Sequence, residues 1–226
     1  MKTIHSSMKD IHHIHGVIFD MDGVLVDSER LYLRFWREAS AAFGFAMSEA
    51  QALSLRSNSP EAAIPKFRAW FGESADYHAI RAKRREMMAE WIDREGVALK
   101  QGAAEVTREL KAHGYRIALA TASPLRRAEH YLAPHGLWGI FDAVIGGPDV
   151  TRSKPAPDIY LAAAAALRLP PAACLAAEDS PSGVRAAHDA GCFTVMIPDL
   201  TPPDGESRSL ADCVLDNLTQ LRTLLL

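Results

Sequence analysis

The sequence is poor in cysteine, with only Cys174, Cys192 and Cys213 among its 226 residues. They are odd in number, widely spaced and without a CxxC pair. A nucleophile or a metal site is the functional alternative for such residues, but free cysteine is commonly buried. We therefore expect three small core residues in a reduced compartment.

Long hydrophobic runs are also missing. No apolar stretch approaches the roughly 20 residues that a membrane-spanning helix needs. The N-terminal segment MKTIHSSMKDIHHIHG lacks the apolar stretch of a signal peptide. These absences argue against a membrane protein and favour a cytoplasmic location, with a monomer as the default oligomeric state.

Charge of one sign is not in excess, since 25 Lys and Arg oppose 28 Asp and Glu for a formal net charge of −3. Without a broad basic surface, nucleic acid is a poor candidate for a partner. The chain has no GxGxxG after its first predicted strand and no GxxxxGKS/T loop, which argues against dinucleotide binding and P-loop chemistry. Its 48% hydrophobic and 23% charged residues are typical of a globular protein with a buried core.

The first part of the chain predicts one strand followed by helices. The run GVIFD at 16–20 is short, apolar and stops at a carboxylate, as a buried parallel strand would. Asp27 or Ser28 is expected to cap a helix that Gly44 ends. Further helices are expected near 48–56, 60–71 and 74–95, without a strand in that stretch.

From Gly102 onward the pattern alternates between helix and strand. Strands are expected at 115–121, 142–146, 174–178, 193–197 and near 213–215, and helices at 103–112, 124–134, 157–168, 182–190 and from about 217. Such alternation predicts βαβ units and a parallel sheet covered on both faces. The fold class is therefore α/β, with a core domain (1–27 and 100–226) and a helical cap domain (28–99) inserted after the first strand.

Polar residues gather at the predicted strand ends, where ligands bind in open parallel sheets. They are Asp20 and Asp22, the segment Thr121-Ala122-Ser123, Lys154 in a loop, and the pair Glu178-Asp179. Helix capping alone does not explain an Asp-x-Asp, a lysine and a Glu-Asp pair together. The set therefore predicts one active site.

Three carboxylates in one crevice repel one another unless a cation is supplied. Asp20, Asp22 and Asp179 offer the hard oxygen ligands that suit Mg²⁺, which also screens the charge of an approaching phosphate. Asp20 can then act as a covalent nucleophile that forms an aspartyl phosphate. Asp22, two residues later, can protonate the leaving alkoxide and later deprotonate the attacking water.

Donors for the phosphoryl oxygens are expected from Thr121 and Lys154. Ser123-Pro124 is interpreted as the N-cap and first residue of a helix, whose free N–H groups favour an anion. Ser180-Pro181 repeats this arrangement after Asp179.

The segments DMDGVLVDSE, TAS, SKPAPDIY and EDSPSG resemble the motifs of the haloacid dehalogenase superfamily. The match is to the capped subfamily that includes β-phosphoglucomutase and sugar-phosphate phosphatases, and it spans 16–197. The resemblance implies a Rossmann-like parallel-sheet core, a helical cap inserted after the first strand, magnesium as cofactor and a small phosphorylated metabolite as substrate.

The resemblance also implies residue roles. It makes Asp20 the nucleophile and a metal ligand, Asp22 the acid and base with its backbone carbonyl on the metal, Thr121 to Ser123 and Lys154 phosphate ligands, and Asp179 a metal ligand. Glu178 matches a position that supports the metal directly or from behind.

Other reactions on the same motifs remain as alternatives. Haloacid dehalogenases and phosphonatases generally lack the second aspartate, so Asp22 favours phosphate esters. A β-phosphoglucomutase usually continues the Thr121 motif with lysine and asparagine, whereas Pro124 and Leu125 stand here, and its cap arginine has no clear match at Ser59. Hydrolysis is therefore the leading hypothesis, ahead of a mutase and of a non-catalytic phospholigand sensor.

Three features of the cap are interpreted as structural. The aromatics Phe35, Trp36, Phe67, Trp70, Phe71 and Trp91 recur at helical spacing and are expected to form its core. The run Lys83-Arg84-Arg85 is expected to be solvated. Arg56 could reach a hydroxyl or carboxylate of the substrate, but solvation is the slightly favoured interpretation. Asp27 and Glu29 are expected to cap a helix.

Overall fold

The described residues, 11–56 and 58–226, form a six-stranded sheet in the computed structural model, with strand order β3-β2-β1-β4-β5-β6. The strands are β1 (Gly16–Phe19), β2 (Arg116–Thr121), β3 (Ala143–Gly146), β4 (Cys174–Glu178), β5 (Phe193–Met196) and β6 (Cys213–Val214). Each pairs with its neighbours in parallel. The predicted parallel sheet is therefore confirmed, and its order reverses beside β1.

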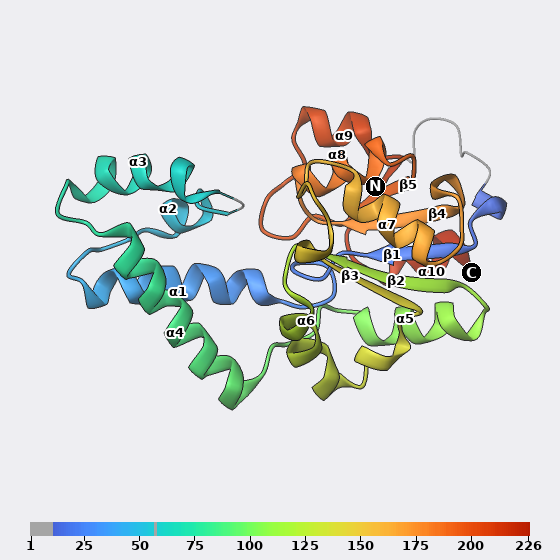
Figure 1. Ribbon diagram of the computed structural model, residues 1–226, viewed down its shortest axis with the longest axis horizontal. Coiled ribbons are helices and arrows are strands. Elements are labelled where there is room, and N and C mark those ends of the chain that lie inside the picture. Colours follow the sequence, from blue (N-terminus) through green and yellow to red (C-terminus); the bar gives the residue numbers. More distant parts are fainter. Residues whose placement is uncertain (1–10, 57) are drawn as a thin grey trace. The chain divides into compact units, whose positions relative to one another are not determined.

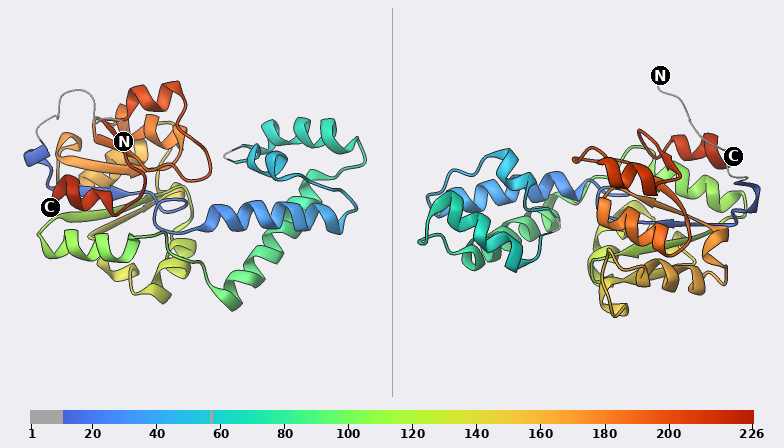
Figure 2. Two further views of the ribbon diagram at one scale, coloured as in Figure 1. Left: turned by 180° about the vertical axis from the view of Figure 1, so that it is seen from behind. Right: turned by 90° about the horizontal axis from the view of Figure 1, so that it is seen from above.

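Helices cover both faces of this sheet (Figures 1 and 2). On one face lie α5 (Ala103–Ala112) and α6 (Leu125–Leu132), with α10 (Gln220–Leu225) against α5. On the other lie α7 (Asp158–Ala166) and α8 (Pro181–Asp189), with α9 (Gly205–Leu210) against α8. Short 3-10 helices are η1 (Ile11–His13), η2 (Ala133–His135), η3 (Trp138–Ile140), η4 (Gly147–Asp149) and η5 (Pro171–Ala173). Right-handed crossovers explain why a change of direction along the sheet changes the covered face.

The core under α7 and α8 is built from small side chains. Ala163, Ala164 and Ala186 are fully buried against Ile18 and its neighbours on the sheet. Small residues let a helix approach the sheet closely, which explains the alanine-rich sequence of α7. Cys174 and Cys192 lie in this core as free thiols, as expected, and Cys213 is half-buried. Burial raises the pKa of Cys174 to about 11 and, with Cys174 beside it, that of Cys192 to about 12.

Two aspartates fix the start of a strand in the same way. Asp142 donates its N–H to the carbonyl of Ile117 at 2.8 Å and accepts from the Ile117 N–H at 2.8 Å. Asp212 does the same with Thr194, at 2.8 and 2.9 Å. Each side chain closes a ring with the neighbouring strand, so the register of β3 on β2 and of β6 on β5 is set at its first residue.

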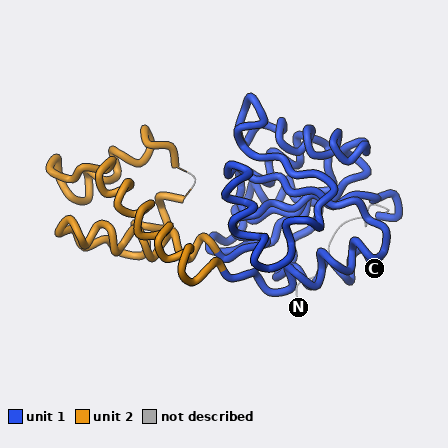
Figure 3. The backbone as a smooth tube through the Cα atoms, turned by 60° about the horizontal axis from the view of Figure 1, so that its bottom comes forward, with its two compact units in different colours: residues 1–27, 98–226 blue, residues 28–97 orange. Residues whose placement is uncertain are grey.

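Residues 28–97 form the second of two compact units, and the first holds the residues up to Asp27 with 98–226 (Figure 3). The second unit contains α1 (Ser28–Ala42), α2 (Glu49–Leu53), α3 (Pro60–Phe71) and α4 (Tyr77–Glu95). Trp36 packs on the rings of Phe67 and Tyr77, with centroids 5.5 and 5.8 Å apart. These three residues and Phe35 are buried. The expected aromatic core is therefore present in part, because Trp70, Phe71 and Trp91 are only half-buried. This part of the chain is helical, as predicted.

Two cations of the helical unit are not solvated as expected. Arg84 is 6% exposed, and its guanidinium carbon lies 4.6 Å from the ring centroid of Tyr32 and 4.9 Å from that of Trp36. Nε of Arg56 lies 2.7 Å from Oε2 of Glu29, with side chains 12% and 17% exposed. Aromatic faces and a carboxylate replace the water that a charge needs. Glu29, in the first turn of α1, therefore forms an ion pair with Arg56.

The chain between β5 and β6 also differs from expectation. No helix was predicted there, but α9 begins after Asp204, whose carboxylate accepts from the N–H of Ser207 at 2.7 Å. This capping interaction starts a helix in a segment rich in proline and glycine. Among the helices of the described residues, none combines the length and apolar character that crossing a membrane requires.

Candidate functional site

The predicted acidic residues meet at the carboxyl ends of β1 and β4. Asp20 extends β1 by one residue and donates its N–H to the carbonyl of Ala177 at 3.0 Å. Glu178 is the last residue of β4, and Asp179 follows it. One ligand oxygen from each of Asp20, Glu178 and Asp179 lies within 4.8 Å of the others, and all three residues are buried. Adjacent parallel strands therefore bring together carboxylates that are more than 150 residues apart in the sequence.

Lys154 supplies a positive charge to this cluster. Its Nζ lies 2.5 Å from Oδ1 of Asp20 and 2.5 Å from Oε1 of Glu178. A third bond, 3.2 Å long, goes to the carbonyl of Ala120 on β2. An ammonium group has three hydrogens, so these three acceptors use all of them. Lys154 thus joins the ends of β1, β2 and β4.

Both carboxylate oxygens of Glu178 are occupied by protein donors. Oε1 accepts from Lys154 and from the hydroxyl of Tyr160, at 2.7 Å. Oε2 accepts from the N–H of Asp179 at 3.0 Å and from the N–H and hydroxyl of Ser180 at 3.2 and 3.1 Å. Charge-assisted bonds of this kind hold a carboxylate in one orientation. Glu178 therefore organises the loop that presents Asp179.

Tyr160 was not predicted as part of the site. It lies on α7, fully buried, and its ring centroid is 5.1 Å from Nζ of Lys154. Burial and the carboxylates of Glu178 and Asp20 raise its pKa well above normal, so the hydroxyl stays a donor. Its place within SKPAPDIY, on the buried face of a helix that follows Lys154, is the signal from which it could have been found.

Glycine is required at two positions beside the carboxylates. Gly23 has φ +85°, and a Cβ there would lie 2.4 Å from Oδ2 of Asp179. A Cβ on Gly183 would lie 1.9 Å from the carboxyl carbon of Glu178. Real Cβ atoms do not approach other atoms so closely, and the φ of Gly23 is unfavourable for any other residue. The glycines therefore let the carboxylates pack against the backbone.

Asp22 is half-buried, and its side chain is hydrogen-bonded to Ser123. The turn that carries it is closed by a 2.9 Å bond from the N–H of Gly23 to the carbonyl of Val26. Oδ2 of Asp22 accepts from the hydroxyl of Ser123 at 3.1 Å. Its carboxylate therefore contacts the β2–α6 loop, and its charge contributes to raising the pKa of Asp20.

The Thr121-Ala122-Ser123 segment differs in one respect from expectation. Ser123 is not the N-cap of α6, because Pro124 holds that position and the helix starts at Leu125. Proline fixes an extended backbone before the helix, which leaves the Ser123 hydroxyl for Asp22. The N–H of Ser123 donates to Oγ1 of the buried Thr121 at 3.1 Å, and Ala122 is exposed.

Ser180 is an N-cap, as predicted. Its hydroxyl oxygen accepts from the N–H of Gly183 at 3.1 Å, and Pro181 is the first residue of α8. The same hydroxyl donates to Glu178, so the start of α8 is tied to the end of β4.

The cluster carries more negative charge than its protein cations balance. Burial raises the pKa of Asp20 to about 8, with contributions from Glu178 and Asp22, although Lys154 acts in the opposite direction. Burial also raises the pKa of Glu178, but Lys154 and the other donors outweigh it and hold the value below normal. A buried carboxylate that resists ionisation is typical of a site completed by a cation. The oxygen donors of Asp20 and Asp179 fit a hard divalent ion.

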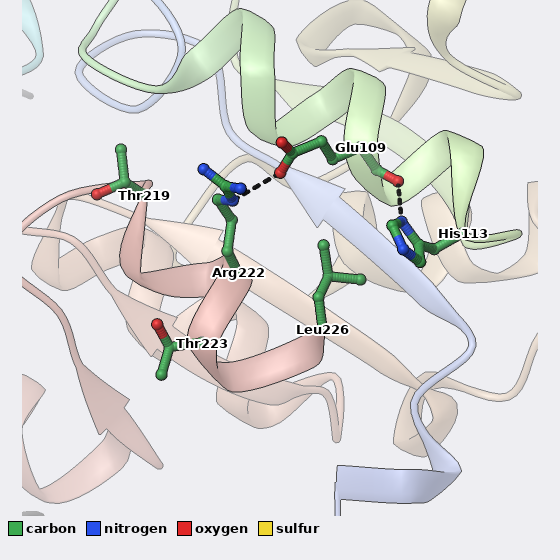
Figure 4. A pocket seen from close by; sticks show the side chains of 6 residues that line it. All are labelled: Glu109, His113, Thr219, Arg222, Thr223 and Leu226. Carbon is green, nitrogen blue, oxygen red and sulfur yellow. Dashed lines mark hydrogen bonds and ion pairs between the residues drawn. The ribbon is translucent and has the colours of Figure 1, made fainter.

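A pocket on the same unit lies elsewhere (Figure 4). It is lined by Glu109, His113, Thr219, Arg222, Thr223 and Leu226. Nε of Arg222 lies 2.7 Å from Oε2 of Glu109. The hydroxyl of Tyr115 donates to the carbonyl of Leu225 at 2.9 Å, which places this pocket beside the start of β2. The acidic cluster lies at the opposite ends of the strands, so the pocket is not part of it.

Comparison with known proteins gives consistent matches over most of the chain. The model of the haloacid dehalogenase-like hydrolases matches residues 14–191. Protein CbbY of Rhodobacter capsulatus is 33% identical over 224 residues, which cover 93% of this chain and 96% of that protein. Hexitol phosphatase B of Escherichia coli K12 is 32% identical over 212 residues, 92% of this chain and 94% of the phosphatase. A crystal structure of mutant CbbY from Rhodobacter sphaeroides in complex with xylulose-(1,5)bisphosphate has a TM-score of 0.72 and 30% identity, covering 92% of this chain and 96% of that one.

Proposed function

Because the chain belongs to the haloacid dehalogenase-like hydrolase family, we propose that it is a magnesium-dependent phosphatase of a small phosphorylated metabolite. One observation carries the proposal: the buried Asp20 carboxylate lies 2.5 Å from Nζ of Lys154, beside oxygens of Glu178 and Asp179. A carboxylate attacks a phosphate only where positive charge offsets the repulsion between two anions. Lys154 supplies part of that charge, and the oxygens of Asp20 and Asp179 would hold the divalent ion that supplies the rest.

The first half of the reaction transfers the phosphoryl group to the protein. An oxygen of the Asp20 carboxylate attacks phosphorus, and the bond from phosphorus to the ester oxygen breaks. Asp22, in its acid form, gives its proton to the departing alkoxide, which leaves as an alcohol. The products at this stage are an aspartyl phosphate on Asp20 and a carboxylate at Asp22.

The second half returns the protein to its starting state. The Asp22 carboxylate takes a proton from water, and the water oxygen attacks the phosphorus of the aspartyl phosphate. The bond from phosphorus to the Asp20 oxygen breaks with its electrons returning to the carboxylate, and inorganic phosphate leaves. The first half-reaction needs an acid for the leaving oxygen, and the second needs a base for the attacking water. Asp22 serves as both, because the loss of its proton in the first half leaves the carboxylate required in the second.

Donors around Asp20 hold the phosphoryl oxygens. Lys154 contributes its positive charge beside Asp20. The hydroxyl of Thr121 keeps its hydrogen while accepting from Ser123, and the backbone of Ala122 and Ser123 adds N–H groups. Such donors are worth most where water is excluded and they need no rearrangement.

Asp20, Asp179 and the backbone carbonyl of Asp22 are the ligands assigned to magnesium. The ion, when bound, screens the charge of the phosphate that approaches Asp20. Glu178 acts from behind these ligands, since five protein donors already occupy its oxygens.

The substrate class is a sugar phosphate or a related polyol phosphate. Two similar proteins support this class. Hexitol phosphatase B matches 92% of this chain, and the CbbY mutant, which also matches 92% of it, was crystallised with a sugar bisphosphate. A β-phosphoglucomutase remains the second candidate, and Pro124 and Leu125 in place of its lysine and asparagine argue against it. A phospholigand sensor is the third, and it would have no need of both Asp20 and Asp22.

The test is release of inorganic phosphate from a panel of sugar, polyol and nucleotide phosphates, with and without Mg²⁺. Asp20→Asn, which is nearly isosteric, is the control for contaminating phosphatase. Magnesium-dependent release that the variant lacks supports the proposal. An isomerised sugar phosphate without free phosphate would favour the mutase, and binding without turnover would favour the sensor.

A further inference from the structure

A hydrogen-bonded chain leads from α6 to the carboxylate of Asp22. Nη1 of Arg127 donates to Oγ of Ser123 at 3.3 Å, and the same Oγ donates to Oδ2 of Asp22 at 3.1 Å. Arg127 follows Ser123 by four residues, so the first turn of α6 brings its side chain back beside the loop. The three residues lie in one compact unit and come from two strand ends and a helix.

The direction of this chain follows from the donors available. A guanidinium group can only donate, and a serine hydroxyl has a single hydrogen. Since Arg127 donates to Oγ, the hydroxyl hydrogen is directed to Asp22 rather than shared with the arginine. The serine backbone is held as well, because its N–H donates to Oγ1 of Thr121 at 3.1 Å.

The middle residue of this hydrogen-bonded chain is buried. Ser123 is 6% exposed, and Arg127 and Asp22 are half-buried. Arg127 donates to the hydroxyl that donates to Asp22, so a guanidinium charge lies at one end of this hydrogen-bonded chain and a carboxylate at the other. Hydrogen bonds that include a charged donor are stronger than neutral ones and orient their partners more firmly.

We propose that Arg127 is a positioning residue for the proton transfer by Asp22, acting through the hydroxyl of Ser123. The inference rests on the proposed phosphatase function. Arg127 sets the rotamer of Ser123, and Ser123 aims the carboxyl group of Asp22 at the ester oxygen of the substrate. From the sequence, Ser123 was expected to be a helix N-cap and a phosphate ligand, and Arg127 had no expected role.

The consequence differs between substrates. When the ester bond of an alkyl phosphate breaks, the alkoxide needs the proton from Asp22, because an alkoxide is a poor leaving group. When p-nitrophenyl phosphate reacts, nitrophenolate leaves without a proton. A misplaced acid therefore slows the alkyl ester and spares the aryl ester, whereas general damage to the site slows both.

The experiment measures kcat/KM of the full-length protein with Mg²⁺ for p-nitrophenyl phosphate and for the best alkyl phosphate of the panel. This ratio reports the steps up to loss of the leaving group. We expect Arg127→Ala to lower it about tenfold for the alkyl ester and less than about twofold for the aryl ester. Arg126→Ala, at the exposed neighbouring position, is the matched control and should change neither.

A double-mutant cycle separates this role from others. Ser123→Ala should show the same preference for the aryl ester, and Arg127→Ala added to it should cause no further loss for the alkyl ester. Arg127→Lys, which retains a charged donor, guards against a folding defect and should recover part of the activity. Equal losses for both esters, or additive effects of the two substitutions, would overturn the inference while leaving the phosphatase intact. A wild-type protein that releases phosphate from neither ester would overturn both.

Discussion

Nζ of Lys154 lies 2.5 Å from Oδ1 of Asp20, with the two side chains 9% and 10% exposed. The same nitrogen lies 2.5 Å from Glu178, whose side chain is 1% exposed. One cation therefore compensates two buried carboxylates. A carboxylate that loses such a partner inside a protein must either take up a proton or remain as an uncompensated charge.

Replacing Lys154 by methionine should therefore destabilise the metal-free protein. We expect a loss of about 3–5 kcal/mol in the free energy of unfolding, the cost typical of breaking a buried ion pair by removing one partner. Urea denaturation with and without Mg²⁺ measures it, and added metal should reduce the loss. Lys111→Met is the control, because Lys111 pairs with Asp142 at side chains 39% and 36% exposed, where a pair is worth less than about 1 kcal/mol. Similar losses for the two variants would contradict this account of Lys154.

Asp22→Asn should separate the two half-reactions. With p-nitrophenyl phosphate the first step needs no acid, but the second lacks its base, so we expect a burst of about one equivalent of nitrophenol before slow turnover. Steady-state kcat should fall by about 10²–10⁴. Rapid-mixing absorbance measures the burst, and mass spectrometry of quenched protein should find one added phosphoryl group. Asp20→Asn is the comparison, since without the nucleophile neither burst nor adduct should form.

The acidic cluster could be predicted from the sequence because its position follows from the topology of a parallel sheet. Carboxyl ends of adjacent parallel strands share one edge of a sheet, so Asp20 after β1 and Glu178 at the end of β4 had to be neighbours. The family resemblance drawn from the same motifs is confirmed by the match over residues 14–191. Strand β4 and helix α5 have the predicted bounds. A short apolar run that ends at a carboxylate marks the strand, and Gly102 marks the start of the helix.

Side-chain partners were predicted less well, because they depend on tertiary contacts that spacing does not encode. Arg84 belongs to a basic run, and only the packing of α1 on α4 places Tyr32 and Trp36 around it. Glu29 and Arg56 are 27 residues apart, and their ion pair forms once α2 ends beside α1. Local charge patterns predict solvation by default, and burial of a charge is the exception.

The role of Ser123 shows the same limit within the site. Ser-Pro before a helix is a common N-cap signal, and Ser180-Pro181 conforms to it, since Ser180 is the N-cap of α8. Ser123-Pro124 has the same letters, but α6 begins one residue later, so the serine hydroxyl is directed to Asp22. A shift of one residue at a helix start changes a capping residue into a hydrogen-bond donor to Asp22, the residue proposed as acid and base.

Gly183→Ala tests how closely Glu178 must pack on α8. The new Cβ would lie 1.9 Å from the carboxyl carbon of Glu178, so the carboxylate has to move and its bonds to Lys154 and Ser180 weaken. We expect a loss of about 1–3 kcal/mol in the free energy of unfolding and a larger proportional fall in Mg²⁺ affinity than in substrate affinity. Titration of metal by calorimetry and thermal melts measure the two effects. Gly205→Ala, where an added Cβ meets open space, is the control and should leave both unchanged. A Gly183→Ala protein with wild-type metal affinity would show that Glu178 does not position the ligands.

Asp142→Asn should change the pH dependence of stability at the start of β3. Burial raises the pKa of Asp142, but the hydrogen bonds from Lys111 and from the N–H of Ile117 outweigh it and hold the native value below the ordinary 3.8. A carboxyl whose pKa is lowered by folding stabilises the protein above pH 3.8, and this contribution is lost as the pH falls through the native pKa. Because the side chain is 36% exposed, we expect the variant to lose less than about 1 kcal/mol at pH 7, with the difference closing in acid. Urea denaturation at a series of pH values from neutral to acid measures it, and Lys111→Met should remove the part of the pH dependence that Lys111 contributes. Asparagine can still accept the hydrogen bond from the N–H of Ile117 but carries no charge. A difference between wild type and Asp142→Asn that stays constant or widens in acid would therefore contradict a native pKa of Asp142 below the ordinary value.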